Sequence, residues 1–429
     1  MSAEISGVGQ PGFVGRYGLG ESGLAGSGRA AAAEEVAARI RELGLRTVRL
    51  AVTDQHGIPR GKMMSPEAAI AAMSDGLDFS GAIYSLDTGN QVFVPAFASG
   101  GGFGIAEFTG FPDVVVVPDP ATFRVLPWAD RTGWMLCDVY FGTGQPMPLD
   151  GRGLLRRVLA DLAEAGYDFL AGIEVEFSIV VRSPEELAPE NAGFTPPPPP
   201  VSVFERGYQF LSEVRLDGMG PALEAVRDAL GDVGLPPRSI EDEWGPGQLE
   251  ISFAPMAGLL AHAAPMSVFA VPTVNGYKRF RPYSFAPDRV CWGIENRGVL
   301  VRVQGSPGDT SSHVEMRIGE PAANPYYYLA ANIAAGLDGV RRGMEPPPAS
   351  EADPYALDAP PLPGSLADAV SVLDADPFYR GAFGDTLVSY LVMMKRFEIG
   401  RYREALTEVP LPDGQDVSDW EMREYFEFF

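Results

Sequence analysis

Three separate segments of the chain alternate apolar and charged residues, and each predicts a β-strand with charge on one face. In the first segment, Glu174 and Glu176 alternate with Val175 and Phe177. Because successive side chains of a strand point to opposite faces, both carboxylates lie on the face that the apolar residues leave free. Two like charges side by side repel each other, so something must compensate them. Taken alone, the pair is typical of a solvated sheet face.

The second segment repeats the pattern with a turn in front of it. Glu250 alternates with Leu249 and Ile251, so its carboxylate again points away from the apolar face. The preceding Pro246-Gly247 pair predicts a turn that folds Glu243 back towards Glu250. A surface turn before a strand is the alternative interpretation.

The third segment, residues 313–318, adds positive charge. His313, Glu315 and Arg317 share one face, opposite the apolar side chains of Val314, Met316 and Ile318. Arginines also stand close to apolar runs upstream, at Arg279, Arg297 and Arg302. A lone histidine, at 313 or at 262, is more typical of a structural contact than of a metal ligand.

If these faces converge, they form a site for hard cations and a polyanion. Ligand sets made of oxygen atoms favour Mg²⁺ or Mn²⁺, and arginines favour phosphate or a substrate carboxylate. Such a mixture suits phosphoryl transfer, in which catalysis is mostly positioning and charge neutralisation. The chain has no Walker-type loop, so a nucleotide must be held in another way.

The composition limits which classes of partner and which cellular compartment are expected. The chain of 429 residues has 33 Lys and Arg against 57 Asp and Glu, a net charge of −24. This balance argues against nucleic acid and anionic membranes as partners, since both need clustered positive charge. Cys137 and Cys291 are the two cysteines and form no framework, and neither a membrane span nor a secretory signal is evident. A cytoplasmic protein is expected.

The order of expected elements indicates an α+β fold. A helix over 31–43, strands over 45–53, 114–117 and 134–140, and a helix start at Ser65-Pro66 indicate a small N-terminal α+β domain. A helix over 154–165 and a strand over 168–181 follow the junction near 142–150. Helices dominate after residue 366 and end in a capping box at Ser418–Glu421. The domains predicted are a flexible tail (1–28), an N-terminal domain (29–144) and a catalytic domain (145–429).

The charged segments resemble those of the glutamine synthetase family, and most closely its γ-glutamyl-amide-forming members, such as γ-glutamylanilide synthases. The resemblance covers nearly the whole chain. It rests on GIEVEF (172–177), EWGPGQLEI (243–251), PTVNGYKRFRPYSFAPDR (272–289), ENRGVLVRV (295–303), HVEMRIGEPAANPYYYLAANIAAGLDG (313–339) and the ending SDWEMREYFEFF.

The resemblance implies a small N-terminal β-grasp domain and a C-terminal catalytic α/β domain with a curved antiparallel sheet. It also implies a homo-oligomer with active sites between neighbouring subunits. The implied reaction is ATP-dependent: a γ-carboxylate is activated as an acyl phosphate, which an amine then attacks. Glutamate, or a similar acid, and an amine are therefore the implied substrates, with Mg²⁺ or Mn²⁺ as cofactor.

By position, the resemblance also implies the roles of individual residues. Glu176, Glu243 and Glu250 correspond to ligands of one metal, and Glu174 and Glu315 to ligands of the second. Arg279 and Arg317 resemble the arginines that grip the amino-acid substrate, and Arg297 the one that stabilises the transferring phosphoryl group. Arg302 and His313 lie on the nucleotide side, and Asp87 is aligned with the amine pocket of the next subunit.

Three departures from the family pattern bear on activity. Phe253-Ala254-Pro255-Met256 runs directly into the helix around His262, where members of the family carry several dozen further residues. The missing segment includes a histidine ligand of the second metal and part of the ATP and glutamate sites. His313 stands where an arginine usually approaches ATP. Phe285 replaces a glutamate that helps to deprotonate ammonium, which suits a bulkier amine.

Two functions of different classes follow. The first is an ATP-dependent ligase that forms γ-glutamyl amides, with glutamate as the expected acid and ammonium, an alkyl amine, an aryl amine or a polyamine as the acceptor. The second is a non-catalytic relative that acts as a scaffold or regulatory subunit, which the missing segment favours. Metal-dependent nucleotide hydrolysis without transfer is a third possibility.

Overall fold

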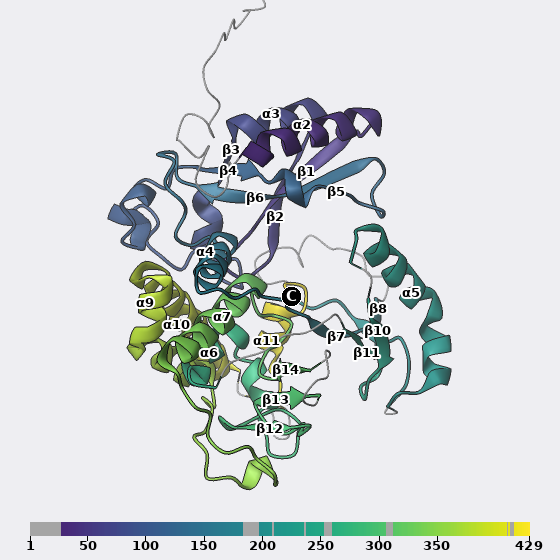
Figure 1. Ribbon diagram of the computed structural model, residues 1–429, viewed down its shortest axis with the longest axis vertical. Helices are drawn as coiled ribbons and strands as arrows, with labels where there is room; N and C mark the ends of the chain where they lie inside the picture. Colours follow the sequence, from purple (N-terminus) through teal and green to yellow (C-terminus); the bar gives the residue numbers. More distant parts are fainter. Residues whose placement is uncertain are drawn as a thin grey trace, which may run out of the picture. The chain divides into compact units, whose positions relative to one another are not determined.

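The computed structural model describes residues 27–182, 197–207, 210–235, 237–252, 260–305, 312–409, 411 and 416–429. These residues form two compact units (Figure 1). One contains 27–84, 96–153 and 228–235, and the other contains 85–95, 154–227 and the described residues from 237 onwards. Residues 1–26 of the predicted tail lie outside the described residues, and the predicted boundary at 144/145 stays a prediction.

The first unit is built on a six-stranded sheet with the order β2-β1-β6-β4-β3, and β5 also pairs with β6. The β1–β6 pairing is parallel and the other pairings are antiparallel. The strands are β1 (Thr47–Thr53), β2 (Pro59–Met64), β3 (Leu77–Phe79), β4 (Val114–Pro118), β5 (Arg124–Val125) and β6 (Thr132–Tyr140).

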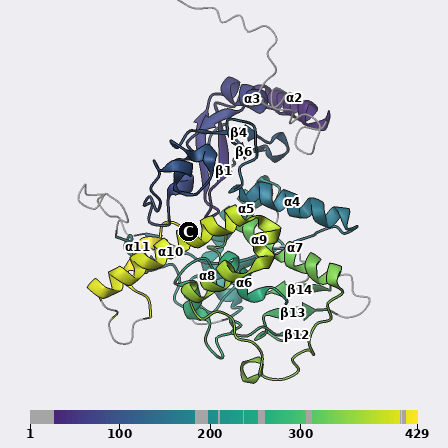
Figure 2. The ribbon, with the colours of Figure 1, turned by 90° about the vertical axis from the view of Figure 1, so that its left-hand side faces the viewer.

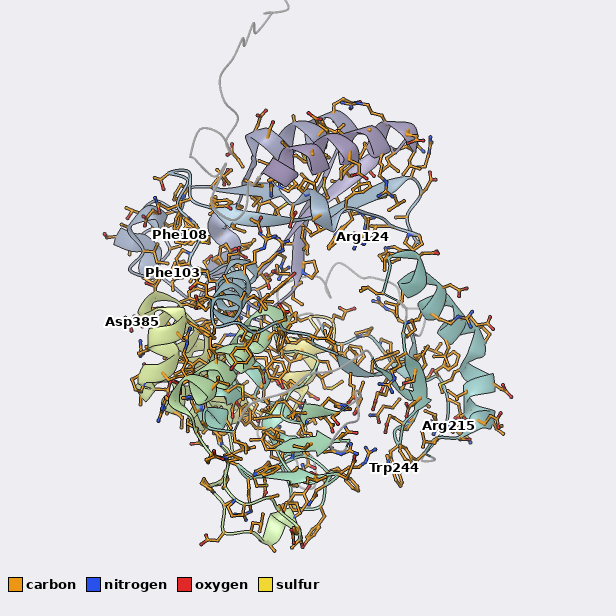
Figure 3. The ribbon with its side chains drawn as sticks, in the orientation of Figure 1. Phe103, Phe108, Arg124, Arg215, Trp244 and Asp385 are labelled. Atoms are coloured by element: carbon orange, nitrogen blue, oxygen red, sulfur yellow. The ribbon has the colours of Figure 1, made fainter. Side chains whose placement is uncertain are left out.

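Helices α2 (Ser27–Glu42) and α3 (Pro66–Asp75) cover one face of this sheet (Figure 1). The Ser65 hydroxyl accepts a hydrogen bond from the Ala68 amide and caps α3, as predicted. Among the described residues, the short 3-10 helices are η1 (Gly81–Ser85), η2 (Ser99–Gly102), η3 (Ala106–Phe108), η4 (Pro120–Thr122), η6 (Gly276–Arg279) and η7 (Pro354–Ala356). The half-buried Phe103 packs edge to face against the buried Phe108 of η3, and both are labelled in Figure 3.

In the second unit, the three-stranded antiparallel sheet β10-β11-β7 packs its apolar face against helix α5 (Glu213–Asp232). Its strands are β7 (Glu174–Ser178), β10 (Ser239–Asp242) and β11 (Gln248–Ser252). Met219 and Leu223 of α5 meet Leu249 of β11 in a buried cluster, and Phe177 and Ile240 pack around it. Burying this apolar face leaves the opposite face of the sheet for charged side chains.

A second three-stranded sheet, β12-β13-β14, lies beside a group of helices (Figure 2). Its strands are β12 (Trp292–Ile294), β13 (Val301–Gln304) and β14 (His313–Met316). The β12–β13 pairing is parallel, whereas antiparallel pairing was expected throughout. The helices are α6 (Ala263–Ala270), α7 (Pro325–Arg342), α8 (Leu366–Ala375), α9 (Pro377–Phe383), α10 (Asp385–Glu408) and α11 (Asp419–Tyr425).

Most predicted elements form, with shifted ends. Helix α4 (Gly151–Glu164) matches the predicted helix over 154–165. The strand predicted over 168–181 begins only at Glu174 and divides into β7 and β8 (Val180–Arg182), and β8 pairs with β9 (Val201–Val203). The predicted capping box on α11 forms. None of the helices in the described ranges is long and apolar enough to cross a membrane.

A buried ion pair fixes α5 to the strand that leads into the carboxylate-bearing turn. The guanidinium of Arg215 on α5 contacts the fully buried carboxylate of Asp242, at 3.2 Å between Nη1 and Oδ1. Arg215 also donates to the carbonyl oxygens of Glu243 (3.4 Å) and Gly245 (3.1 Å). Figure 3 places Arg215 and Trp244 at the same end of α5. The Arg215 side chain therefore fixes the end of β10 and the start of the turn that follows it.

Replacing Arg215 by methionine is expected to lower the free energy of unfolding by about 3–5 kcal/mol, because the Asp242 carboxylate stays buried without its partner. Chemical denaturation of the wild type and the variant measures the change. Arg227→Met, at an exposed position of the same helix, is the matched control. Equal losses in both variants would contradict a special role for the buried pair.

Candidate active site

Carboxylates line up across the three strands of the β10-β11-β7 sheet. Glu250 lies directly opposite Glu176 on one side and directly opposite Glu241 on the other. Directly opposed residues share a face, with Cβ atoms about 5 Å apart. Glu174 lies on the same face, two residues before Glu176. The predicted shared face of Glu174 and Glu176 is confirmed, and the register adds Glu250 to that face.

The turn after β10 brings in one more carboxylate. The Glu243 amide donates to the Gln248 carbonyl at 3.0 Å, and the Glu243 and Glu250 carboxyl groups share a hydrogen bond. Gly247 has a φ of +66°, and a Cβ there would lie 2.7 Å from the Ile179 carbonyl oxygen, so only glycine fits. We call Glu174, Glu176, Glu241, Glu243 and Glu250 the carboxylate cluster.

Burial and mutual repulsion raise the proton affinity of two carboxylates in the carboxylate cluster. Burial, followed by the negative charges of Glu174 and Glu176, raises the pKa of Glu250 to about 7. Burial and the charge of Glu176 also raise the pKa of Glu243. Repulsion of this kind is relieved by a proton or by a bound cation. The cluster therefore has the electrostatics of a cation site.

The β13–β14 pair forms a second charged group, centred on Glu315. Glu315 lies directly opposite Arg302 in the register. Arg302 donates to its carboxylate at 3.2 Å, Arg317 donates to the other oxygen, and Gln304 adds a third contact at 3.2 Å. We call Arg302, Glu315 and Arg317 the arginine cluster. Glu315, predicted as a metal ligand, is thus already neutralised by two arginines.

Glu174 connects the two clusters. Burial raises the pKa of Glu174, and the Glu315 carboxylate raises it further, whereas Arg317, His313 and Arg302 lower it. Glu174 also contributes to the raised pKa of Glu250. Charges from β7, β11, β13 and β14 therefore act on one another, as expected if the charged faces of the three segments converge.

Arg279 is held by backbone carbonyls. Its guanidinium donates to the carbonyl of Ile318 and, at 3.0 Å, to that of Gly319, just beyond β14. Its Cζ lies 4.9 Å from the centre of the Phe280 ring. Burial lowers the pKa of Arg279, and the nearby Glu320 carboxylate acts in the opposite direction.

Three of the predicted arginines keep a buried donor that is not used within the described residues. The Nε atoms of Arg279, Arg302 and Arg317 are buried and have no hydrogen-bond partner there. An unsatisfied buried donor costs about 1–3 kcal/mol, more when it is charged. A phosphate or carboxylate oxygen would satisfy such donors. The donor set therefore fits an anionic substrate.

Arg297 differs from these arginines because it is exposed. It lies in the turn between β12 and β13, and no hydrogen bond or ion pair fixes its guanidinium within the described residues. His313 is half-buried on β14, opposite Gln304. The predicted roles of Arg297 and His313 stay predictions.

The loop that contains Phe285 contacts the arginine cluster. Arg317 donates to the Phe285 carbonyl at 3.4 Å. Phe285 and Tyr283 both adopt a positive φ, of 61° and 64°, which is unfavourable for residues with a Cβ. The Phe285 ring is 62% exposed, so its surface is open to a ligand.

Asp87 lies among other charges. Its carboxylate accepts hydrogen bonds from Arg401 Nε (2.7 Å) and from the Gln91 amide (2.9 Å), and it is buried. Its charged neighbours are Arg401 and Glu424, not the carboxylate cluster. The predicted contact with an amine in a neighbouring subunit stays a prediction.

Sequence reasoning missed Glu241. This residue stands in the same Glu241-Asp242-Glu243 run as the predicted ligand Glu243, and only the register places its side chain opposite Glu250. The available signal was the alternation of Ile240 and the buried Asp242 with Glu241, which marks a short strand. His262 is structural, as predicted: its Nε2 lies 2.8 Å from Asp338, and its ring stacks on Phe378.

A divalent cation fits the donor chemistry of the carboxylate cluster, which offers oxygen atoms only. Within the described ranges, no three His, Cys, Asp or Glu side chains are already arranged as a metal site. The side chains must therefore adjust to bind a cation. The junction at 253–256, where a segment was predicted to be missing, lies outside the described residues.

Comparison with known proteins finds similarity to one enzyme family. The catalytic domain of glutamine synthetases matches residues 148–256 and 254–412. A γ-glutamylanilide synthase from Acinetobacter sp is 36% identical over 479 aligned positions, which cover 92% of this chain and 95% of that protein. A γ-glutamylethanolamide synthetase, GlnA4, from Streptomyces coelicolor is 28% identical over 74% of this chain and 80% of its own length.

Solved structures agree on the fold. The structure titled "Apo GmaS without ligand" superposes with a TM-score of 0.68 at 23% identity, covering 91% of this chain and 99% of that one. The predicted mixed fold with a glutamine-synthetase-type catalytic domain is confirmed, while the β-grasp character of the N-terminal domain stays a prediction. The chain belongs to the glutamine synthetase family.

Proposed function

We propose that this protein is an ATP-dependent ligase that joins a glutamate-like acid to an amine. The observation that carries the proposal is a sheet face on which carboxylates stand opposite one another, together with arginines that keep buried, unused donors and whose charges act on Glu174. One group offers oxygen ligands for a cation, and the other offers buried donors for anions. The family and the γ-glutamyl-amide-forming relatives support the same reaction class.

The reaction has two steps. An oxygen of the acid's carboxylate attacks the γ-phosphorus of ATP, and ADP leaves, which gives an acyl phosphate. The amine nitrogen then attacks the carbonyl carbon, phosphate leaves, and the nitrogen loses a proton. Bound Mg²⁺ or Mn²⁺ would neutralise the charge of the phosphates.

Two groups of carboxylates would hold the cations. Glu176, Glu243 and Glu250 are the proposed ligands of one metal, since they meet on one face of the sheet. Glu174 and Glu315 are the proposed ligands of the second. For Glu315 this requires that Arg302 and Arg317 release its carboxylate, after which Arg317 can contact a substrate while Arg302 keeps its bond to Glu295 at 2.7 Å.

The arginines divide between the two substrates. Arg279 and Arg317 are proposed to bind the acid, since each keeps a buried Nε without a partner among the described residues. Arg297, Arg302 and His313 are proposed to bind the nucleotide. The exposed guanidinium of Arg297 suits a group that contacts the transferring phosphoryl only when substrate is bound.

The oligomeric state and the cellular compartment are also proposed from the family. We infer a homo-oligomer with active sites between subunits, in which Asp87 serves the amine side of a neighbour's site. Both cysteines are free and buried, which suits a cytoplasmic protein.

A non-catalytic role is the second candidate. The alignment to the γ-glutamylanilide synthase spans 479 positions although this chain has 429 residues, and the two matched parts of the catalytic domain meet at 254–256. Both facts support a missing segment at that junction. A scaffold or regulatory subunit would keep the fold without turnover.

Phosphate release from Mg-ATP with glutamate, measured with and without amines, separates the two candidates. The ligase proposal predicts amine-dependent release, with alkyl or aryl amines better than ammonium because the exposed Phe285 ring offers an apolar surface. No release from a folded oligomer would establish the non-catalytic role instead.

Phe285→Glu is expected to shift the preference towards ammonium, because a carboxylate beside the amine favours a small cation over an apolar ring. The ratio of kcat/KM for ammonium to that for an aryl amine measures the shift. Phe285→Leu keeps an apolar side chain and is the control. An unchanged ratio in Phe285→Glu would remove this residue from the amine site.

Glu250→Gln is expected to stabilise the protein in the absence of divalent cations at about pH 8 but not at about pH 5. The pKa of Glu250 is raised to about 7, so the folded state binds more protons than the unfolded state between the two pKa values. The stability that Glu250 contributes to the wild type is therefore present at low pH. It is lost as the pH rises through about 7. Glutamine removes both the buried charge and the repulsion that cause this loss.

Thermal unfolding at both pH values, with and without Mg²⁺, measures the effect. Mg²⁺ at the higher pH should raise the Tm of the wild type more than that of Glu250→Gln. Glu224→Gln, an exposed position on α5, is the control. The same difference in Tm between Glu250→Gln and wild type at both pH values would disprove the electrostatic account.

A further inference from the structure

We propose that Glu421 of helix α11 is a positioning residue for the segment 273–279, which ends in Arg279. The inference rests on the proposed function in one respect, namely that Arg279 binds the acid. Helix α11 would thus help to fix the position of Arg279, although it lies far along the chain from every candidate ligand.

Glu421 is buried and contacts this segment at two residues. Its carboxylate accepts hydrogen bonds from Asn275 Nδ2 at 2.9 Å and from Lys278 Nζ at 2.6 Å. Burial acts to raise the pKa of Glu421, but the hydrogen bonds from Lys278, Ser418 and Asn275 lower it overall. The carboxylate is therefore charged at neutral pH, and its bond to Lys278 is a charge-assisted one.

A second carboxylate, half-buried, holds the same segment from another element. Glu320, which follows β14, accepts hydrogen bonds from the Thr273 hydroxyl (2.9 Å) and the Thr273 amide (3.3 Å). A Cβ at Gly276 would lie 1.9 Å from Glu320 Oε2, so the backbone there approaches as closely as glycine permits. The segment is thus fixed between Glu320 and Glu421.

Helix α11 is itself firmly anchored, so it can serve as a support. Ser418 and Glu421 form its capping box. Glu424 is buried and bonded to Arg401, and the Tyr425 hydroxyl lies 2.5 Å from Glu398. Tyr425 also accepts a hydrogen bond from the Val274 amide at 3.3 Å, a third link to the segment.

The position of Arg279 depends on these links because they fix the backbone from which its side chain extends. Its guanidinium bonds to carbonyl oxygens, and its Nε has no partner among the described residues. Arg279 is the last residue of η6, immediately after Lys278. A shift of the Lys278 backbone therefore moves Arg279 relative to the arginine cluster, and misplacement by about 1 Å is enough to weaken substrate positioning.

Lys278→Met tests the inference and leaves both residues of the α11 capping box in place, since it removes only the ammonium that bonds to Glu421 and to the Asp416 carbonyl. We expect faster amide hydrogen exchange confined to residues 272–280, a KM for glutamate raised about tenfold, and an unchanged KM for ATP. Lys278→Arg keeps the charge and should restore wild-type behaviour. Asp419→Asn removes an exposed carboxylate from the first turn of α11. It should change neither the exchange over 272–280 nor the KM for glutamate.

The outcomes separate this inference from the proposed function. Wild-type exchange over 272–280 in Lys278→Met, or faster exchange across the whole chain with both KM values raised alike, overturns the positioning role. If the wild type shows no amine-dependent turnover, the proposed function fails. Hydrogen exchange over 272–280 then still decides whether Glu421 positions the segment.

Discussion

Repulsion among carboxylates on one face of a sheet is the constraint on which the site depends. Glu176, Glu250 and Glu241 stand opposite one another on neighbouring strands, an arrangement that costs free energy without a counter-charge. The apolar contacts on the other face, between α5 and β11, and the buried Arg215–Asp242 pair hold the strands together nonetheless. The fold thus stores repulsion that cation binding can release, a common property of functional sites.

The arginine cluster is the complement of this arrangement. Arg302 and Arg317 both contact Glu315, so a positively charged group stands next to Glu174 and the carboxylate cluster. In the structure the two arginines are paired with Glu315, and Arg302 is also paired with Glu295. Binding a cation to the carboxylates and an anion to the arginines would replace these internal contacts with contacts to substrates, which suits a site that assembles fully only when ligands bind.

The sequence was sufficient to predict the charged strand faces. Alternation at Glu174–Phe177 and at Leu249–Ile251 has a period of two, and that period alone decides which side chains share a face. The turn at Gly247 and the capping box at Ser418 were predictable for the same reason, since each rests on neighbouring residues. These features are local.

Features that depend on register or on distant partners were not predictable in the same way. Glu241 joins the carboxylate cluster only because β10 pairs with β11 in one particular register. The pairing of Asp87 with Arg401, 314 residues along the chain, has no local signal. The same holds for the contact of Glu421 with Lys278, and for the parallel pairing of β12 with β13.

The most direct test of the account is a crystal structure of the protein soaked with Mn²⁺ and ADP, read by anomalous scattering from the metal. The account predicts a Mn²⁺ ion bound by carboxylate oxygens of Glu176, Glu243 and Glu250, at about 2.2 Å. Anomalous density elsewhere, with these three side chains unmoved, would contradict the assignment of the carboxylate cluster as the cation site.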